Sequence, residues 1–178
     1  MANVKKRLAI PKDNYILFHH TGQSFVIPVD PESVADAMGA SFAPNSPLSR
    51  SAPIYSYQNS GPRTVQLQFT LHRDLCNEFN PGEEDMVDAL IRCLDEAVLP
   101  DYQSAGKIVN PPIVSVKIRD EIYIKGVVQG GITTTFGLPI INYNGADKYA
   151  KVSFSFNIAE ITPYSASILP SIGKYRRA

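Results

Sequence analysis

The chain has 178 residues, which suits one folded domain with a sizeable core, since domains commonly contain about 100–200 residues. Hydrophobic residues make up 44% of it and charged residues 19%, a balance that excludes an intrinsically disordered chain. Seventeen basic residues offset 17 acidic ones, so no net field draws the chain to nucleic acid or to an anionic membrane. We expect a single domain over residues 1–178, without specific nucleic-acid binding.

Targeting and redox signals are absent from the sequence. No stretch approaches the roughly 20 apolar residues that cross a bilayer, and the N-terminus lacks the apolar region of a signal peptide. We expect synthesis that ends in the cytoplasm and no membrane partner. Basic clusters at residues 5–7 and 174–177 are typical of solvated tails. Cys76 and Cys93 lack the spacing of a metal or redox site, so we expect both to be reduced.

Two short apolar runs near the N-terminus, residues 15–18 and 25–27, predict a β-hairpin around a turn at residues 21–24. Residues 28–62 follow and predict a long loop, in which we consider only a short helix over Glu32 to Met38. A loop this long is functional or becomes ordered on a partner. Its prolines are Pro28, Pro31, Pro44, Pro47, Pro53 and Pro62.

Residues 64–71 are the clearest strand, because apolar and polar residues alternate from Thr64 to Leu71. A helix is predicted next, with Asn80 as its N-cap, Pro81 at the first helical position, and its end at about Leu99 before Pro100. Its apolar stripe predicts one buried face, on which Cys93 is a small packed residue. The stripe contains Met86, Val87, Leu90, Ile91, Leu94 and Val98.

The second half of the chain predicts a β-meander. Residues 113–118, 121–128 and 132–136 are strand candidates, separated by turns at residues 119–120 and at Gly130-Gly131. Residues 137–147 predict an ordered loop with an Asn-Gly turn. A long alternating strand over residues 148–161 and an irregular tail over residues 163–178 complete the chain. The order predicts a mainly β fold, an antiparallel β-sandwich or small β-barrel with one flanking α-helix.

The histidines and acidic residues offer little for catalysis. Alternation sends His19 and His20 to opposite faces of a strand, which disfavours a shared metal ion. His72, Arg73 and Asp74 favour a turn-stabilising salt bridge. The acidic run at residues 83–85 is explained by the positive end of the helix dipole.

Sequence motifs for cofactors and nucleophiles are also missing. The chain has no phosphate loop, dinucleotide fingerprint, nucleophile elbow or HExxH zinc motif. Gly130-Gly131 fits a tight hairpin better than a phosphate cradle. We therefore assign no catalytic, cofactor-binding or metal-binding residue and expect a protein that is not an enzyme. Outward strand positions carry mostly Thr, Gln, Ser and Asn, which suits contact with another protein or plain solvent exposure.

Several segments together resemble the tube-like domain of baseplate hub proteins, which belong to contractile phage tails and related injection machines and include hub proteins that carry a LysM module. The resemblance covers roughly Ser56 to Ile161. Its motifs are a Pro-Pro-hydrophobic strand at residues 110–118, a strand that reaches Gly126-Val127-Val128, a loop with Pro139, and a long alternating strand that ends at Glu160.

The resemblance implies a tail-tube-like domain whose copies form a ring, hexameric in the family, around a tail channel through which DNA passes. Its implied partners are further copies of this chain and neighbouring tail tube and baseplate proteins, and its implied location is the virion. Residues 28–62 and the tail after Tyr164 are then candidate arms that become ordered on neighbours.

Two alternatives remain open. A stand-alone β-sandwich that binds carbohydrate or peptide requires exposed aromatic residues such as Tyr55, Tyr57, Tyr143 and Tyr149 to gather on one face. An unrecognised hydrolase requires His72 or the acidic helix start to lie in a cleft.

Overall fold

The computed structural model describes residues 14–48, 51–80, 84–99 and 112–161, and every structural statement below concerns these residues. The predicted irregular tail at residues 163–178, the basic clusters at both ends, Pro81 and Glu83 lie outside them.

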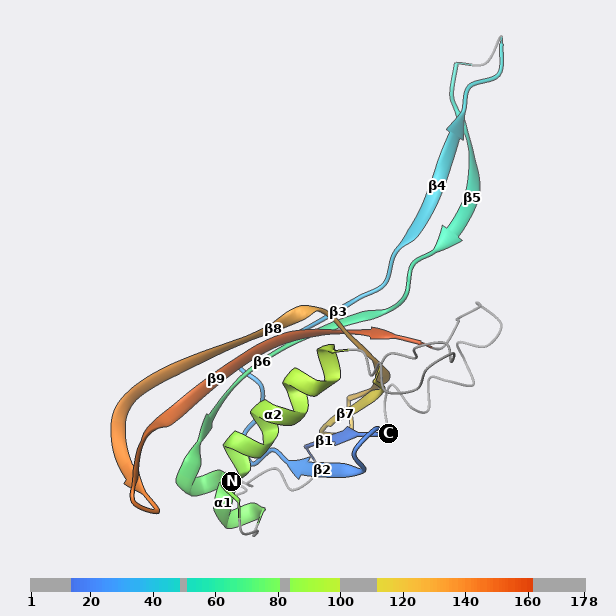
Figure 1. Cartoon of the computed structure of the whole chain (residues 1–178). Coiled ribbons are helices and arrows are strands. Elements are labelled where there is room, and N and C mark those ends of the chain that lie inside the picture. The colour runs from blue at the N-terminus through green and yellow to red at the C-terminus, as the bar shows by residue number, and fades with distance from the viewer. Residues whose placement is uncertain (1–13, 49–50, 81–83, 100–111, 162–178) are drawn as a thin grey trace, which may run out of the picture.

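One antiparallel sheet of seven strands, in the order β2-β1-β7-β8-β9-β6-β3, forms the body of the protein. Two further strands pair only with each other, and two helices flank the large sheet (Figure 1). The predicted mainly β class with a flanking helix is confirmed. The elements are β1 (Tyr15–Phe18), β2 (Gln23–Val26), β3 (Ser33–Ala37), β4 (Ala40–Asn45), β5 (Ile54–Ser60), β6 (Thr64–His72), α1 (Arg73–Phe79), α2 (Met86–Val98), β7 (Val114–Ile118), β8 (Ile122–Tyr143) and β9 (Ala146–Glu160).

The core lies between the large sheet and α2, over which the sheet curves in Figure 1. Strands β6 and β9 pair from Thr64↔Ala159 to His72↔Lys151, and every second residue is buried from Val65 to Leu71 and from Val152 to Ile158. Because directly paired residues share a face, Leu67 and Phe69 lie beside Phe156 and Phe154. The buried stripe of α2, which includes Leu90 and Leu94, covers this apolar face. The alternation predicted for both strands is confirmed.

The predicted loop over residues 28–62 is wrong, because this segment contains β3, β4 and β5. The short helix considered over Glu32 to Met38 is also wrong. Val34 pairs with Leu67 of β6, and this tertiary pairing overrides a weak local helical tendency. Pro44 is tolerated within β4 because that strand belongs to an isolated two-stranded ribbon with free edges.

The predicted helix start at Asn80 is wrong as well. Asn80 follows a short helix, α1, that the sequence did not predict, and its side chain bonds the backbone N and O of Val26 at 2.8 and 2.9 Å. The longer helix begins at Met86, where the side chain of Asp85 accepts a hydrogen bond from Val87 N. Asn80 is therefore the C-cap of α1, and the N-cap of the longer helix is Asp85.

Strand β8 is longer than predicted, since it runs without a hairpin through Gly130-Gly131 and through most of the predicted loop at residues 137–147. The two glycines have φ of 79° and 93° and lie at a register shift against β9, the geometry of a β-bulge. Strand β9 pairs with β8 on both sides of this bulge, so β8 continues as one strand. The Asn144-Gly145 turn is confirmed, with φ of 51° and 82°.

We expect Gly126→Ala to destabilise the fold by about 3 kcal/mol. An added Cβ at Gly126 meets the carbonyl oxygen of Ala159 at 2.0 Å, so β8 and β9 must move apart. Gly137→Ala is the matched control, because its Cβ meets nothing closer than 3.7 Å. Urea unfolding of the two variants measures the difference, and equal midpoints would contradict the close packing at Gly126.

Candidate functional site

The arm, formed by β4 and β5, is the part of the described chain that extends furthest from the core. All but one of its strand residues are exposed, and Figure 1 shows it projecting away from the large sheet. Its base is closed by a hydrogen bond of 2.9 Å from Gly61 N to Gly39 O. A two-stranded ribbon with no sheet or helix packed on it is marginally stable in water. The arm is therefore suited to contact with another molecule.

The two faces of the arm differ in character. Phe42 pairs with Tyr57 and Pro44 with Tyr55, and residues two apart on a strand share a face, so these four residues form one aromatic face. The rings of Phe42 and Tyr57 meet edge to face at 5.7 Å, yet the two residues are 54% and 59% exposed. Ala43, Asn45, Ser56 and Gln58 lie on the other face together with Ile54, which is 46% exposed, so this face carries no aromatic ring and mixes polar with aliphatic side chains.

Arg63 fixes the place where the arm joins the sheet. Its side chain is only 2% exposed, and its guanidinium donates to both carboxylate oxygens of Asp36 on β3 at 2.8 Å. It also donates to the carbonyl oxygen of Tyr123 at 3.2 Å and lies 3.6 Å from a carboxylate oxygen of Glu160. These contacts join β3, β8 and β9 next to the start of β6, so the root of the arm is held rigidly.

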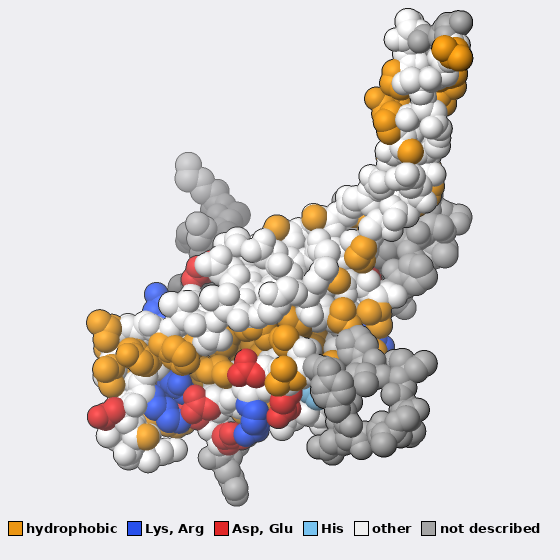
Figure 2. All heavy atoms as spheres, turned by 45° about the horizontal axis from the view of Figure 1, so that its top comes forward, with side chains coloured by type: hydrophobic (Ala, Val, Ile, Leu, Met, Phe, Trp, Pro, Cys, Tyr) orange, Lys and Arg blue, Asp and Glu red, His pale blue; other side chains and the backbone are white. Residues whose placement is uncertain are grey.

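The outer face of the large sheet is mainly polar where β3, β6, β9 and β8 lie side by side, with the Glu32 carboxylate bound to Thr70 and Lys151 in the row beyond Ser153 as its charged margin. Figure 2 shows this face as a broad area without charged side chains. Thr70 and Ser153 hydrogen-bond across β6 and β9 at 2.7 Å. The predicted polar outward face is confirmed. Its rows are Ser33, Gln68, Ser155 and Thr133; Ala35, Gln66, Asn157 and Gln129; and Thr70, Ser153 and Thr135.

An apolar band follows β8 and the end of α2. Figure 2 shows it between the polar sheet face and the charged side chains of the helices. Leu138 is 74% exposed, and a shallow hollow near Ile132 is lined by the last turn of α2. Exposed apolar patches of this kind mark interaction sites. The apolar band consists of Val98, Leu99, Ile132, Phe136, Leu138 and Ile140.

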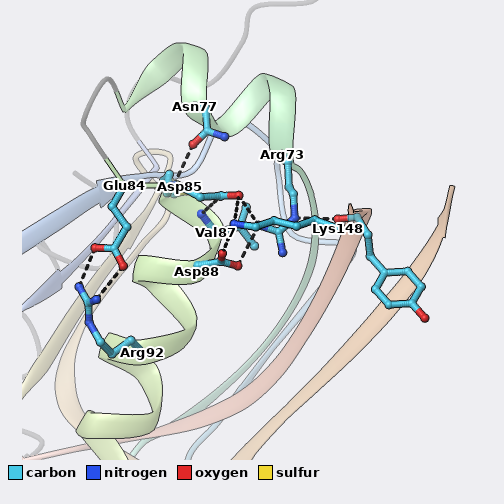
Figure 3. A network of polar contacts seen from close by, with 10 residues as sticks. Arg73, Asn77, Glu84, Asp85, Val87, Asp88, Arg92 and Lys148 are labelled. Atoms are coloured by element: carbon cyan, nitrogen blue, oxygen red, sulfur yellow. Dashed lines mark hydrogen bonds and ion pairs between the residues drawn. The ribbon is translucent and has the colours of Figure 1, made fainter. Parts of the chain in front are cut away.

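A charge cluster fastens the β8–β9 hairpin to the helices (Figure 3). Arg73, 3% exposed, binds Asp85 and lies 2.8 Å from Asp88, while its Nε donates to the Tyr149 carbonyl oxygen at 2.7 Å. Lys148 lies 2.5 Å from Asp88 and 3.4 Å from Asp85. The two cations and two anions balance, which a buried guanidinium requires. The predicted local salt bridge of Arg73 with Asp74 is replaced by these pairs with residues further along the chain.

The side chains considered for catalysis lie apart from one another. His19 and His20 follow β1 in a turn and have different partners, Ser115 Oγ at 2.7 Å and Glu96 at 3.7 Å. The His19–Ser115 pair was not predicted from the sequence. Ser115 is buried on β7, and the sequence feature that could have indicated the pair is a serine between the two valines of this strand. His72 is exposed at the end of β6, and Glu84 of the acidic run pairs with Arg92 in the open.

Neither cysteine is an activated nucleophile. Burial raises the pKa of the Cys76 thiol to about 12 and also raises the pKa of Cys93. A thiol becomes reactive when its pKa is lowered, so neither thiol is activated. Cys76 packs in the core, and the Cys93 thiol donates a hydrogen bond to Gln23 Oε1 at 2.7 Å. The prediction of a packed Cys93 is confirmed, since it is buried on α2.

Other kinds of site are also missing from the described residues. Within residues 14–48, 51–80, 84–99 and 112–161, no three His, Cys, Asp or Glu side chains come together as metal ligands. None of the helices in those ranges has the length and apolarity to cross a bilayer. The tyrosines that a carbohydrate site would need are divided, with Tyr55 and Tyr57 on the arm and Tyr143 and Tyr149 at the far end of β8 and β9 (Figure 1).

We expect Asp85→Ala to lower the free energy of unfolding by about 3 kcal/mol, because it removes a carboxylate from the buried Arg73 and the N-cap of α2. Thermal or urea unfolding measures the loss. Glu84→Ala is the control, since it removes only the exposed pair with Arg92 and should leave the midpoint unchanged. Similar losses in both variants would contradict the role given to the charge cluster.

Ionisation of Asp88 should make the free energy of unfolding depend on pH in the acidic range. Burial alone would raise its pKa, but hydrogen bonds from Lys148 and Arg73 outweigh burial and hold the pKa below the ordinary value of 3.8. Its stabilisation is therefore present above pH 3.8 and is lost as pH falls through the folded-state pKa. Unfolding curves from neutral pH down to below 3.8 should show this loss in the native protein and a smaller one in Asp88→Asn. If the stability of the native protein and of Asp88→Asn fell equally with pH, the result would contradict the pairing of Asp88 with Lys148 and Arg73.

Comparison with known proteins gives similarity in structure only. No protein-family model and no curated protein matches the sequence. One similar solved structure is the virion of a native gene transfer agent (GTA) particle, 12% identical, with a TM-score of 0.41 over 88% of this chain and 98% of that chain. Another is the tail of an empty GTA particle with C6 symmetry, 14% identical, with a TM-score of 0.38 over 87% and 96%. Because both TM-scores lie below 0.5, neither likeness decides the function.

Proposed function

We propose that this protein is a structural subunit of a phage or phage-like contractile tail, located in the tail tube or baseplate hub, whose copies form a ring around the tail channel. The observation that carries the proposal is the arm. It presents an aromatic face that no described part of its own chain covers, on a root that Arg63 holds in place. Such a rigidly mounted apolar projection is stabilised by docking on a neighbour.

The arrangement of surfaces supports a ring over a symmetric dimer. The arm projects at one end of the molecule, and the apolar band extends toward the other end along β8 (Figure 1). Contact between different surfaces of successive copies is heterologous, and such contacts close into rings when the rotation allows. Six copies is the number that the sequence resemblance implies.

The residues that carry the sequence resemblance have defined structural roles. The hydrophobic run after Pro112 is β7, and Gly126 lies where β8 comes closest to the backbone of β9. Pro139 lies at the second register shift of β8, and Glu160 contacts Arg63 at the root of the arm. These positions shape the sheet from which the arm projects, as expected for a tube-forming domain.

The polar sheet face supports passage of DNA without specific binding. Its three rows contain Ser, Thr, Gln, Asn and Ala, with no lysine or arginine to bind phosphate. The carbohydrate-binding alternative has no comparable support, since its four tyrosines do not gather on one face.

Negative-stain microscopy and native mass measurement of the purified protein over a range of concentrations test the proposal. We expect rings or stacked tubes for the intact chain. A variant in which a short Gly-Ser linker replaces residues 40–60 should remain folded, because the core lies in the large sheet and α2, and should stay monomeric. An intact chain that is monomeric at every concentration would overturn the proposal, and glycan binding by that monomer would support the carbohydrate-binding alternative.

A further inference from the structure

We infer that the aromatic face of the arm docks on the apolar band of a second copy of this chain, beside β8 and the end of α2. This inference deepens the proposed function and rests on it, since it names the surface that receives the arm. The aromatic face consists of Phe42, Pro44, Tyr55 and Tyr57, and the apolar band contains Leu99, Phe136, Leu138 and Ile140 among its residues.

The arm cannot cover the apolar band of its own chain. Figure 1 shows the arm leaving the sheet beyond β3 and β6 and pointing away from the body, whereas β8 turns toward the opposite end. Among the described residues, therefore, neither apolar surface is covered by the other. Because one chain carries both surfaces, a second copy supplies the missing partner for each, and head-to-tail repetition leaves neither surface open within a closed ring.

The lack of charged residues on the arm and in the apolar band favours this pairing. The described residues of the segment that holds the arm, 40–48 and 51–60, contain no Asp, Glu, Lys or Arg. The six residues of the apolar band are all uncharged. Apart from Asp95, which also lines the hollow near Ile132, docking one on the other removes no charged side chain of these surfaces from water. Docking on the charged face of the helices would desolvate both Arg92 and Glu84.

The area available fits an interface of ordinary size. Phe42, Tyr55 and Tyr57 are 54%, 65% and 59% exposed, and half of the surface of three large aromatic side chains amounts to roughly 300 Å². A standard interface takes about 800 Å² from each partner. Pro44 and the rest of the two exposed strands can supply the remainder, so the aromatic side chains form the central anchors of the contact.

The edge of β8 offers backbone groups beside the apolar band. Strand β7 pairs only with Ile122–Gly126 of β8, because Pro112 lies just before β7 and has no N–H to extend the ladder. Among the described strands, none pairs with that edge of β8 beyond Gly126. Strand β5 contains no proline and has a free outer edge, so it can add to β8 of the next copy while its tyrosines reach the band.

Site-specific photo-crosslinking of the full chain tests the inference. The photoreactive residue p-benzoylphenylalanine replaces Tyr57 on the aromatic face in one variant and Gln58 on the opposite face in the control. At concentrations where the chain assembles, we expect the Tyr57 probe to crosslink between copies to peptides that contain residues 98–99 or 132–140. The Gln58 probe should give at least tenfold less of these products. Leu138→Ser, a change at an exposed position, should reduce the Tyr57 crosslink at least fivefold without changing the unfolding midpoint.

The outcomes separate this inference from the proposed function. Rings whose Tyr57 probe crosslinks to the arm of another copy, or to peptides outside the apolar band, would overturn the inference and leave the proposed function intact. Equal crosslinking from the Tyr57 and Gln58 probes would also overturn it. A chain that forms no assembly at any concentration would overturn both.

Discussion

The pairing of β6 with β9 is the interaction on which the rest of the structure depends. Nine consecutive residue pairs place Val65, Leu67, Phe69 and Leu71 in one buried layer, where the aromatic rings of Phe69 contact those of Phe154 and Phe156. The same pairing turns Thr, Gln, Ser and Asn to the opposite face. It also sets Arg63, one residue before β6, at the junction of β3, β8 and β9, where it anchors the arm.

In this arrangement the core lies on one side of the sheet, and the arm and the polar face remain available for contacts. The inner side is closed by α2, and the charge cluster of Arg73, Asp85, Asp88 and Lys148 holds the β8–β9 hairpin down on the helices. Stability is therefore independent of the arm, which contributes no residue to the buried core. A protein built in this way can expose an aromatic ribbon for a neighbour without losing its own fold.

The sequence predicted the elements whose signals are local and failed where distant contacts decide. Strands β6 and β9, the first hairpin and the Asn144-Gly145 turn follow from alternation and turn chemistry, and the structure confirms them. The proline-rich segment concealed β3 to β5, because β3 is stabilised by β6 and by the Arg63–Asp36 pair. Gly130-Gly131 resembled a turn in the sequence, but β8 pairs with β9 both before and after these glycines, so the strand continues. The aromatic face of the arm became visible only through the cross-strand register of Phe42 with Tyr57.

Amide hydrogen exchange of the arm in the monomer and in the assembled protein tests the central claim most directly. In the monomer, the amides on the outer edges of β4 and β5 face solvent and should exchange rapidly. The account predicts strong protection of residues 54–60, and of β8 beyond Gly126, when copies assemble. Exchange in the arm that is equally rapid in the monomer and in the assembled particle would contradict it.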